Sequence, residues 1–138
     1  VNRILAGEGI GASPGSLALL DGLAAPGTPL AVVSSSRNTR TVLDVAGIAD
    51  RFSAVVDGVR AAAEGLPGKP NPHTYLQAAA DLGVPAQRAV VVEDALSGVA
   101  AGRAGGFGLV VGVDRGAGAD ALRDAGADVV VADLQELV

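Results

Sequence analysis

Two adjacent acidic residues, Glu93 and Asp94, directly follow the apolar run AVVV at positions 89–92. Their carboxylate oxygens are hard ligands of the kind that Mg²⁺ binds, usually while keeping several of its waters. The second acid also has a structural interpretation, because an aspartate just before a helix commonly caps it. The pair therefore predicts either a magnesium site or a capped helix, and these two residues by themselves leave both open.

Two other polar stretches could contact a phosphate. SSSRN at 34–38 follows an apolar run and opens a predicted helix, where hydroxyls and free N–H groups suit a phosphate; an ordinary helix cap explains the same letters. GKPNP at 68–72 contains Lys69, the only lysine of the chain. Its ammonium is a compact point charge for a phosphate or for clustered carboxylates, and a solvated loop lysine is the alternative.

Two further features carry weaker signals. His73, the only histidine, has no acid or nucleophile near it in the sequence, so we interpret it as a surface residue. The segment GAGADA at 116–121 matches the G-x-G-x-x-A pattern of a dinucleotide-binding loop. Because the chain has 20 glycines, such matches arise by chance. NAD binding is therefore a minor alternative.

The elements that must position these residues alternate between strand and helix. Short apolar runs predict buried strands at 30–34, 54–58, 89–92, 107–113 and 128–131. Helical spacing of apolar residues predicts helices at 16–25, 38–47, 72–83, 95–105, 118–126 and 133–137, with Asn71 as N-cap of the third. This alternation predicts an α/β fold with an open parallel sheet. Ligands bind such sheets beyond the carboxyl ends of the strands.

Composition narrows the class of protein. The chain has 138 residues, 49% of them hydrophobic, which predicts one globular domain. With one tyrosine, two phenylalanines and no tryptophan or methionine, its core must be filled by small aliphatic side chains. A net charge of -5 with scattered basic residues argues against nucleic-acid binding, and no run approaches the length of a membrane span. The absence of cysteine excludes disulfides and thiolate metal sites and favours a cytoplasmic location.

In combination and in this order, VVSSSRN, GKPNP and VVVEDALSGVAAGRAGG resemble the haloacid dehalogenase (HAD) superfamily of phosphotransferases, most closely its β-phosphoglucomutase-like branch. The resemblance runs from Pro14 to the last predicted helix. It implies a Rossmann-like, HAD-like sheet flanked by helices, and a small phosphorylated substrate such as a sugar phosphate. It also implies that Glu93 and Asp94 bind Mg²⁺, directly or through water.

The same resemblance assigns the phosphate contacts. Ser34 and the backbone of Ser35 would bind the transferring phosphoryl group, and Lys69 would hold that phosphate. Arg37 and Asn38 match positions near the substrate phosphate. A site of this kind works by positioning and charge stabilisation.

The chain departs from the family pattern at the nucleophile, which is the first aspartate of a D-x-D-G motif on a strand preceding all of these segments. The two Asp-Gly pairs present do not supply it, because Leu19 stands two residues before Asp21, and Val55 two residues before Asp57. Neither of these apolar side chains can be phosphorylated. A smaller departure is His73, which replaces the aspartate common after KPxP and removes a favourable charge at a helix start.

These departures predict the carboxyl-terminal portion of an enzyme. We expect residues 1–13 to be a linker from a missing cap domain, and residues 14–138 to form a HAD-like core without the family's central first strand. The parent would be a cytoplasmic phosphatase or sugar-phosphate mutase, and this chain alone would be inactive. The alternative is a non-catalytic module that binds phosphate or associates with itself through strand edges left exposed by the missing strand.

Overall fold

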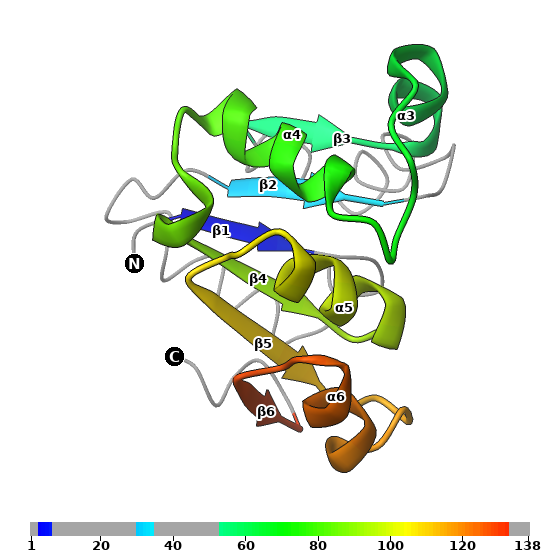
Figure 1. The fold of residues 1–138 in the computed structure, drawn as a ribbon, viewed down its shortest axis with the longest axis vertical. Helices are drawn as coiled ribbons and strands as arrows, with labels where there is room; N and C mark the ends of the chain where they lie inside the picture. Colours follow the sequence, from blue (N-terminus) through cyan, green and yellow to red (C-terminus); the bar gives the residue numbers. More distant parts are fainter. Residues whose placement is uncertain (1–2, 7–29, 35–52, 133–138) are drawn as a thin grey trace.

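The centre of the described part of the fold is a sheet of six parallel strands in the order β3-β2-β1-β4-β5-β6 (Figure 1). A computed structural model of the chain describes residues 3–6, 30–34 and 53–132. The strands are β1 Arg3–Ala6, β2 Leu30–Val33, β3 Ala54–Val56, β4 Ala89–Glu93, β5 Leu109–Val113 and β6 Val129–Val131. The predicted α/β class and open parallel sheet are confirmed, and each predicted strand segment overlaps an observed strand.

Strand β1 lies in the middle of the sheet, between β2 and β4. It pairs in parallel with both neighbours, with Ile4 opposite Leu30 on one side and opposite Val90 on the other. The expectation that the central position would be empty is therefore wrong, because residues 3–6, which we expected in a linker, form the strand there. The physical reason is that β1 supplies partners for ladder N–H and C=O groups that an empty position would leave unpaired.

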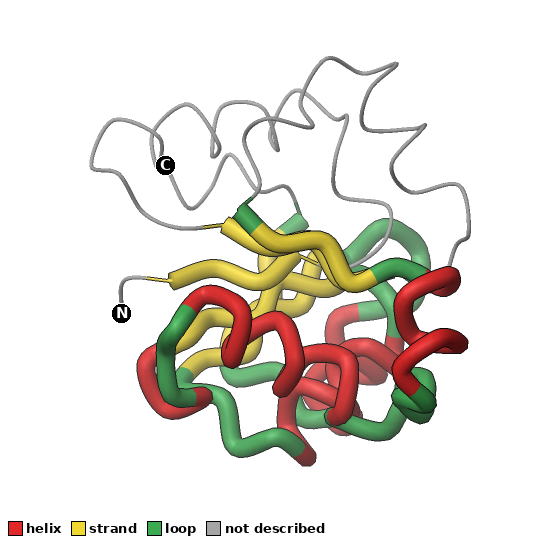
Figure 2. The backbone as a smooth tube through the Cα atoms, turned by 90° about the horizontal axis from the view of Figure 1, so that it is seen from above, coloured by secondary structure: helices red, strands yellow, loops and turns green. Residues whose placement is uncertain are grey.

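Three of the four described α-helices pack on one face of the sheet, and the other, which follows β3, lies beyond the carboxyl end of that strand (Figure 1 and Figure 2). They are α3 Gly58–Glu64, α4 His73–Leu82, α5 Leu96–Ala104 and α6 Ala119–Ala125, with the short 3-10 helix η2 Ala86–Arg88 before β4. Helices α4, α5 and α6 occupy predicted helical segments, whereas α3 and η2 were not predicted. None of the described helices is long and apolar enough to cross a bilayer. The predicted helices at 16–25, 38–47 and 133–137 lie outside the described residues.

Helix α4 begins one residue later than predicted. Its N-cap is Pro72, which has no side-chain cap bond, and the Asn71 side chain donates instead to the Gly68 carbonyl oxygen at 3.0 Å. Asn71 therefore closes the turn that contains Lys69 rather than capping the helix. The helix ends at Gly83, whose φ of 71° is a left-handed conformation that glycine adopts readily.

The core is built from alternate residues of the strands. Val91 and Val110 belong to the cluster that packs under the helices, whereas Val92 and Val111 belong to a second buried cluster. This alternation follows from the pleat, which points successive side chains to opposite faces. Small residues let the helices approach closely, since a Cβ on Gly102 of α5 would stand 3.2 Å from both Val91 and Val110. The predicted core of small aliphatic side chains is confirmed for the described residues.

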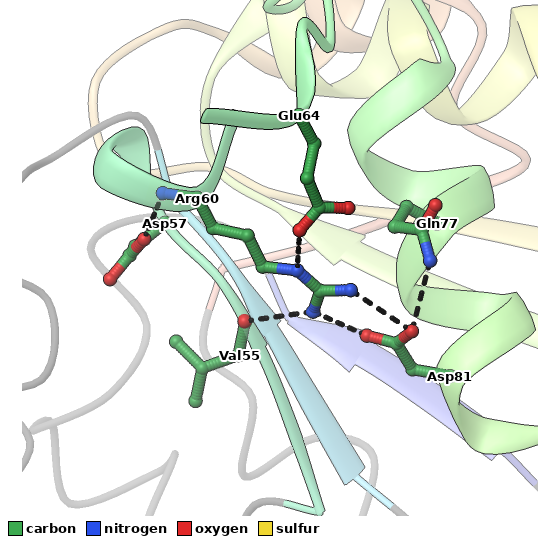
Figure 3. A network of polar contacts seen from close by, with 6 residues as sticks. All are labelled: Val55, Asp57, Arg60, Glu64, Gln77 and Asp81. Carbon is green, nitrogen blue, oxygen red and sulfur yellow. Dashed lines mark hydrogen bonds and ion pairs between the residues drawn. The ribbon is translucent and has the colours of Figure 1, made fainter. Parts of the chain in front are cut away.

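Helix α3 is held by polar contacts, because none of its residues is buried. Asp57, at the end of β3, caps it by accepting the Arg60 N–H at 2.8 Å. The Arg60 guanidinium donates to the Val55 carbonyl oxygen at 3.3 Å and pairs with Asp81 and Glu64 (Figure 3). Hydrogen bonds to these carboxylates raise the pKa of Arg60, and the Arg60 guanidinium lowers the pKa of Asp81. One arginine thus ties α3 to β3 and α4.

Candidate active site

The Lys69 ammonium joins the carboxyl ends of two strands that are not neighbours in the sheet. Its Nζ donates to the Val33 carbonyl oxygen at the end of β2, at 3.2 Å, and to Glu93 Oε2 at the end of β4, at 2.9 Å. Since β1 lies between β2 and β4, the ammonium bridges them across the carboxyl end of the central strand. The Lys69 side chain is only 11% exposed, so it is a fixed charge and not a solvated loop lysine.

Glu93 is completely buried, and both of its carboxylate oxygens are bonded to the protein. Oε2 accepts from Lys69 Nζ at 2.9 Å and from the Tyr75 hydroxyl at 2.7 Å. Oε1 accepts from the backbone N–H groups of Asp94 and Ala95, at 3.1 and 3.2 Å. A buried charge is costly unless it is paired and hydrogen-bonded, and these donors meet that requirement.

The direction of the Glu93 side chain follows from its place in β4. It stands two residues beyond Val91 and therefore points to the same, helix-covered face. There it meets α5, where a Cβ on Gly98 would stand 2.0 Å from Glu93 Oε2. The glycine five residues after Glu93 in the stretch EDALSG is thus needed to make room for the carboxylate.

Tyr75 is a member of the site that the sequence analysis missed. It is completely buried in α4, and its ring contacts the Phe107 ring edge-on at a centroid distance of 6.0 Å. Lys69 Nζ lies 5.2 Å from the centre of the Tyr75 ring, where the π-face attracts a cation. A lone tyrosine in a helical apolar pattern suggests only a core residue. Tyr75 could have been assigned to the site because the hydroxyl of a buried tyrosine usually needs a hydrogen-bond partner.

Asp94 differs from Glu93 because it is only half-buried. It does not cap the following helix, since the N-cap of α5 is Ala95 without a side-chain cap bond. Burial, and then the adjacent Glu93 carboxylate, raise the pKa of Asp94 to about 6, and the positive charge of Arg115 partly opposes the rise. Arg115 is a second residue that the sequence analysis missed. An acid in this environment favours a bound cation, which would offset the repulsion between the carboxylates.

The described residues fit a Mg²⁺ ion in part. Asp94 offers an oxygen ligand where a positive charge is favourable. The Glu93 oxygens already accept four hydrogen bonds from the protein, which occupy the lone pairs that the predicted metal contact would need. Within the described ranges, no three acidic or histidine side chains gather as a ready-made metal group. That is compatible with Mg²⁺, which commonly binds through one or two carboxylates and its own waters.

The phosphate-binding residues predicted after β2 are described only in part. Ser34 follows β2 directly, and its backbone N–H donates to the Val56 carbonyl oxygen at 2.9 Å. Lys69 bonds to the carbonyl of the preceding residue, Val33, so Ser34 and the ammonium lie at the same edge of the sheet. The other three predicted contacts lie outside the described residues: Ser35, Arg37 and Asn38.

Two weaker sequence signals have structural explanations. His73 is exposed, as predicted. In the glycine-rich segment after β5, Asp114 Oδ1 accepts the N–H groups of Gly116 and Gly118, both at 3.1 Å, and these bonds lower the pKa of Asp114. The amides that a dinucleotide loop would present to a phosphate are therefore bonded to this carboxylate.

Comparison with known proteins decides the family. The model of the haloacid dehalogenase-like hydrolases matches residues 3–106. The chain belongs to this family. The matched segment includes β1 and the described residues of the candidate site from Ser34 to Gly98. In this HAD-like hydrolase, the serine, lysine and paired acids therefore stand within the part that the family model recognises.

The relatives of the HAD-like chain include a mutase and a phosphatase. It is 50% identical over 142 residues to beta-phosphoglucomutase from Mycobacterium bovis, a match that covers 100% of the chain but 54% of the relative. The chain thus spans about half the length of that relative. It is 41% identical over 118 residues to trehalose-phosphate phosphatase from Mycobacterium leprae, covering 81% of the chain and 25% of the relative.

Solved structures agree with this assignment. A HAD family hydrolase from Deinococcus radiodurans with bound phosphate and sodium has a TM-score of 0.79 at 35% identity, covering 91% of the chain and 56% of that protein. A beta-phosphoglucomutase from Clostridium difficile also has a TM-score of 0.79, at 28% identity, covering 91% of the chain and 52% of that protein. The HAD-like chain therefore shares the sheet architecture of these proteins.

Proposed function

We propose that this chain forms the phosphate-holding and metal-binding part of a Mg²⁺-dependent phosphotransferase acting on a small phosphorylated metabolite. The observation that carries the proposal is the Lys69 ammonium, fixed between the Val33 carbonyl oxygen and Glu93 Oε2 at the carboxyl edge of the sheet. An ammonium has three N–H donors. Two are used by these contacts, which leaves one for a phosphate oxygen.

Each described site residue has a role in this proposal. Lys69 neutralises the phosphoryl group, and Ser34, at the same edge, contacts it. Asp94 holds the Mg²⁺, and the buried Glu93 carboxylate beside it holds Lys69 in place. When bound, Mg²⁺ supplies the positive charge that offsets the charge of the phosphate oxygens. Positioning and charge stabilisation of this kind are the main requirements of phosphoryl transfer.

The attacking group is assigned to an aspartate, as the family resemblance implies. It would attack the phosphorus of the ester, so that the aspartyl-phosphate forms as the ester P–O bond breaks and the substrate alcohol leaves, and would then pass the phosphoryl group to water or to a sugar hydroxyl. Central strand β1 ends at Ala6, whose methyl group cannot be phosphorylated, and the chain has no D-x-D-G motif. We therefore propose that these 138 residues alone do not turn over phosphate esters, and that the working enzyme draws its aspartate from elsewhere.

A sugar phosphate is the substrate class we propose. Support comes from two relatives, a beta-phosphoglucomutase and a trehalose-phosphate phosphatase. The lysine, serine and paired acids serve a mutase and a phosphatase equally, because both reactions need the same phosphate and metal contacts. We place the enzyme in the cytoplasm, which suits a chain without cysteine.

Titration of the chain with inorganic phosphate, with and without Mg²⁺, tests the site. We expect phosphate to bind and Mg²⁺ to strengthen the binding. Replacing Lys69→Met together with Glu93→Gln removes the ammonium without stranding a buried charge, and should weaken phosphate binding about tenfold or more. Arg88→Met, which removes an exposed cation before β4, is the matched control and should change nothing. Absence of phosphate binding by the unchanged chain would refute the site.

Activity is tested with the chain alone and with a chimera. The chain alone, given sugar phosphates and Mg²⁺, should release no phosphate; a release that Asp94→Asn abolishes would refute its inactivity. A chimera in which this chain replaces the matching part of the Mycobacterium bovis beta-phosphoglucomutase should be active. The same Asp94→Asn change should inactivate the chimera.

The rival proposal is a non-catalytic phosphate-binding module, and it predicts phosphate binding by the chain but an inactive chimera. The alternative of self-association through the edges of β2 and β4 is no longer supported. The edges of β2 and β4 that were expected to be exposed are both paired with β1. The chimera therefore separates the two remaining interpretations.

A further inference from the structure

The ion pair between Lys69 and Glu93 has a third member, the Tyr75 hydroxyl. Oε2 of Glu93 accepts from Lys69 Nζ at 2.9 Å and from the Tyr75 hydroxyl at 2.7 Å. Lys69 Nζ also donates to the Val33 carbonyl oxygen at 3.2 Å. Lys69 Nζ therefore donates to two acceptors, and one of them, Glu93 Oε2, accepts from two donors.

The surroundings leave the Glu93 carboxylate little freedom. It is 0% exposed, and Oε1 is held by two backbone N–H groups at 3.1 and 3.2 Å. On the α5 side, Gly98 lies against the carboxylate, because a Cβ at this position would stand 2.0 Å from Oε2. On the α4 side, the Tyr75 ring is fixed by its edge-on contact with Phe107.

We propose that Tyr75 is a positioning residue that fixes the Lys69 ammonium by acting through Glu93. An oxygen of a carboxylate has two lone pairs, and on Oε2 the hydroxyl takes one while Lys69 takes the other. Without the hydroxyl, Oε2 would lose one of its two donors and could shift, and the ammonium bonded to it would move with it away from the Val33 carbonyl. The hydroxyl thus keeps Lys69 over the carboxyl end of β1, and the consequence for phosphate binding rests on the proposed function.

The composition of the chain makes this inference testable at a single site. Lys69 is the only lysine and Tyr75 the only tyrosine. In a chain labelled with ¹³C at lysine, every labelled side-chain signal therefore comes from Lys69. The two ε-methylene protons of a fixed lysine have different chemical shifts, whereas free rotation about the side chain averages them.

Two substitutions in adjacent residues of α4 form the test. Tyr75→Phe removes the hydroxyl and keeps the ring that Lys69 contacts. Thr74→Val removes the hydroxyl of a buried neighbour that has no hydrogen-bond partner among the described residues, and is the matched control. We expect Tyr75→Phe to bring the two Lys69 ε-proton shifts together and to raise the Kd for inorganic phosphate about tenfold. Thr74→Val should leave both unchanged.

A second measurement uses the unchanged chain, so that it does not depend on the folding of a variant. A hydroxyl proton held between Tyr75 and Glu93 exchanges slowly with water and should give its own proton signal in a chain labelled at tyrosine. The positioning role is overturned if that signal is absent, or if Tyr75→Phe moves the Lys69 signals no more than Thr74→Val does.

The two proposals fail in different ways. Lys69 signals that respond to Tyr75→Phe, in a chain whose signals never respond to phosphate, would support the positioning role and refute the proposed function. Phosphate binding that is the same in Tyr75→Phe and in the unchanged chain would refute the positioning role and leave the proposed function supported.

Discussion

Gly98→Ala is the substitution whose effect can be worked out most directly from the structure. The new Cβ would stand 2.0 Å from Oε2, 2.1 Å from Cδ and 2.3 Å from Cγ of Glu93. These distances are shorter than non-bonded atoms can approach, so the carboxylate or α5 must move. A flexible surface side chain would move at little cost, but Glu93 is buried and holds four hydrogen bonds.

The magnitude follows from what the movement breaks. Separating a buried ion pair costs about 3–5 kcal/mol, and alanine is favoured over glycine inside a helix by about 1 kcal/mol. The net loss should therefore be about 3 kcal/mol of unfolding free energy. For a domain of this size that corresponds to a fall in Tm of roughly 10 °C.

The matched control is Gly102→Ala, the same change one turn later in the same helix. Its Cβ would stand 3.2 Å from the methyl groups of Val91 and Val110, which can shift slightly, so the cost should be offset by helix propensity to within about 1 kcal/mol. Urea unfolding followed by circular dichroism measures both variants. Equal stability of Gly98→Ala and Gly102→Ala would refute the claim that the space beside Gly98 holds a charged carboxylate in place.

Three other outcomes are expected. Lys69→Met alone leaves the Glu93 charge unpaired and should destabilise the fold by about 3–5 kcal/mol, and adding Glu93→Gln should recover most of that loss in urea unfolding. Asp94→Asn should abolish the effect of Mg²⁺ on phosphate binding measured by calorimetry, whereas Asp114→Asn, which removes an acid after the next strand, should keep it. The Arg60 guanidinium lowers the pKa of Asp81 below its ordinary 3.8, so this carboxylate stabilises the fold above that pH, and the contribution is lost as pH falls through the lower folded pKa. Asp81→Asn should therefore cost about 1 kcal/mol near neutral pH, with the difference from the unchanged chain shrinking as the pH falls below 3.8; a constant difference would contradict this.

Much of the fold could be predicted because its signals are local. The apolar run at 89–92 and the helical pattern at 95–105 lie where β4 and α5 are found. Strand β1 could not be predicted in the same way, because Arg3–Ala6 is short and its place depends on pairing with β2 and β4, which are distant in sequence. Helix α3 was missed for a related reason. It buries no residue, so it has no apolar pattern and depends on the contacts of Arg60 with Val55 and Asp81.

The candidate site, like the fold, could be predicted from the sequence only in part. Sequence order and residue type predicted that Ser34, Glu93 and Asp94 would stand at one edge of a parallel sheet, since parallel strands all end on the same side. Lys69 follows no strand, and only the family resemblance placed it there. The tertiary structure decided how they differ: Glu93 points under the helices and is held by Lys69 and Tyr75, whereas Asp94 is only half-buried. No local pattern contains this information. The distinction arises because side chains alternate across the strand, and because burial makes a charge depend on donors from elements far away in the chain.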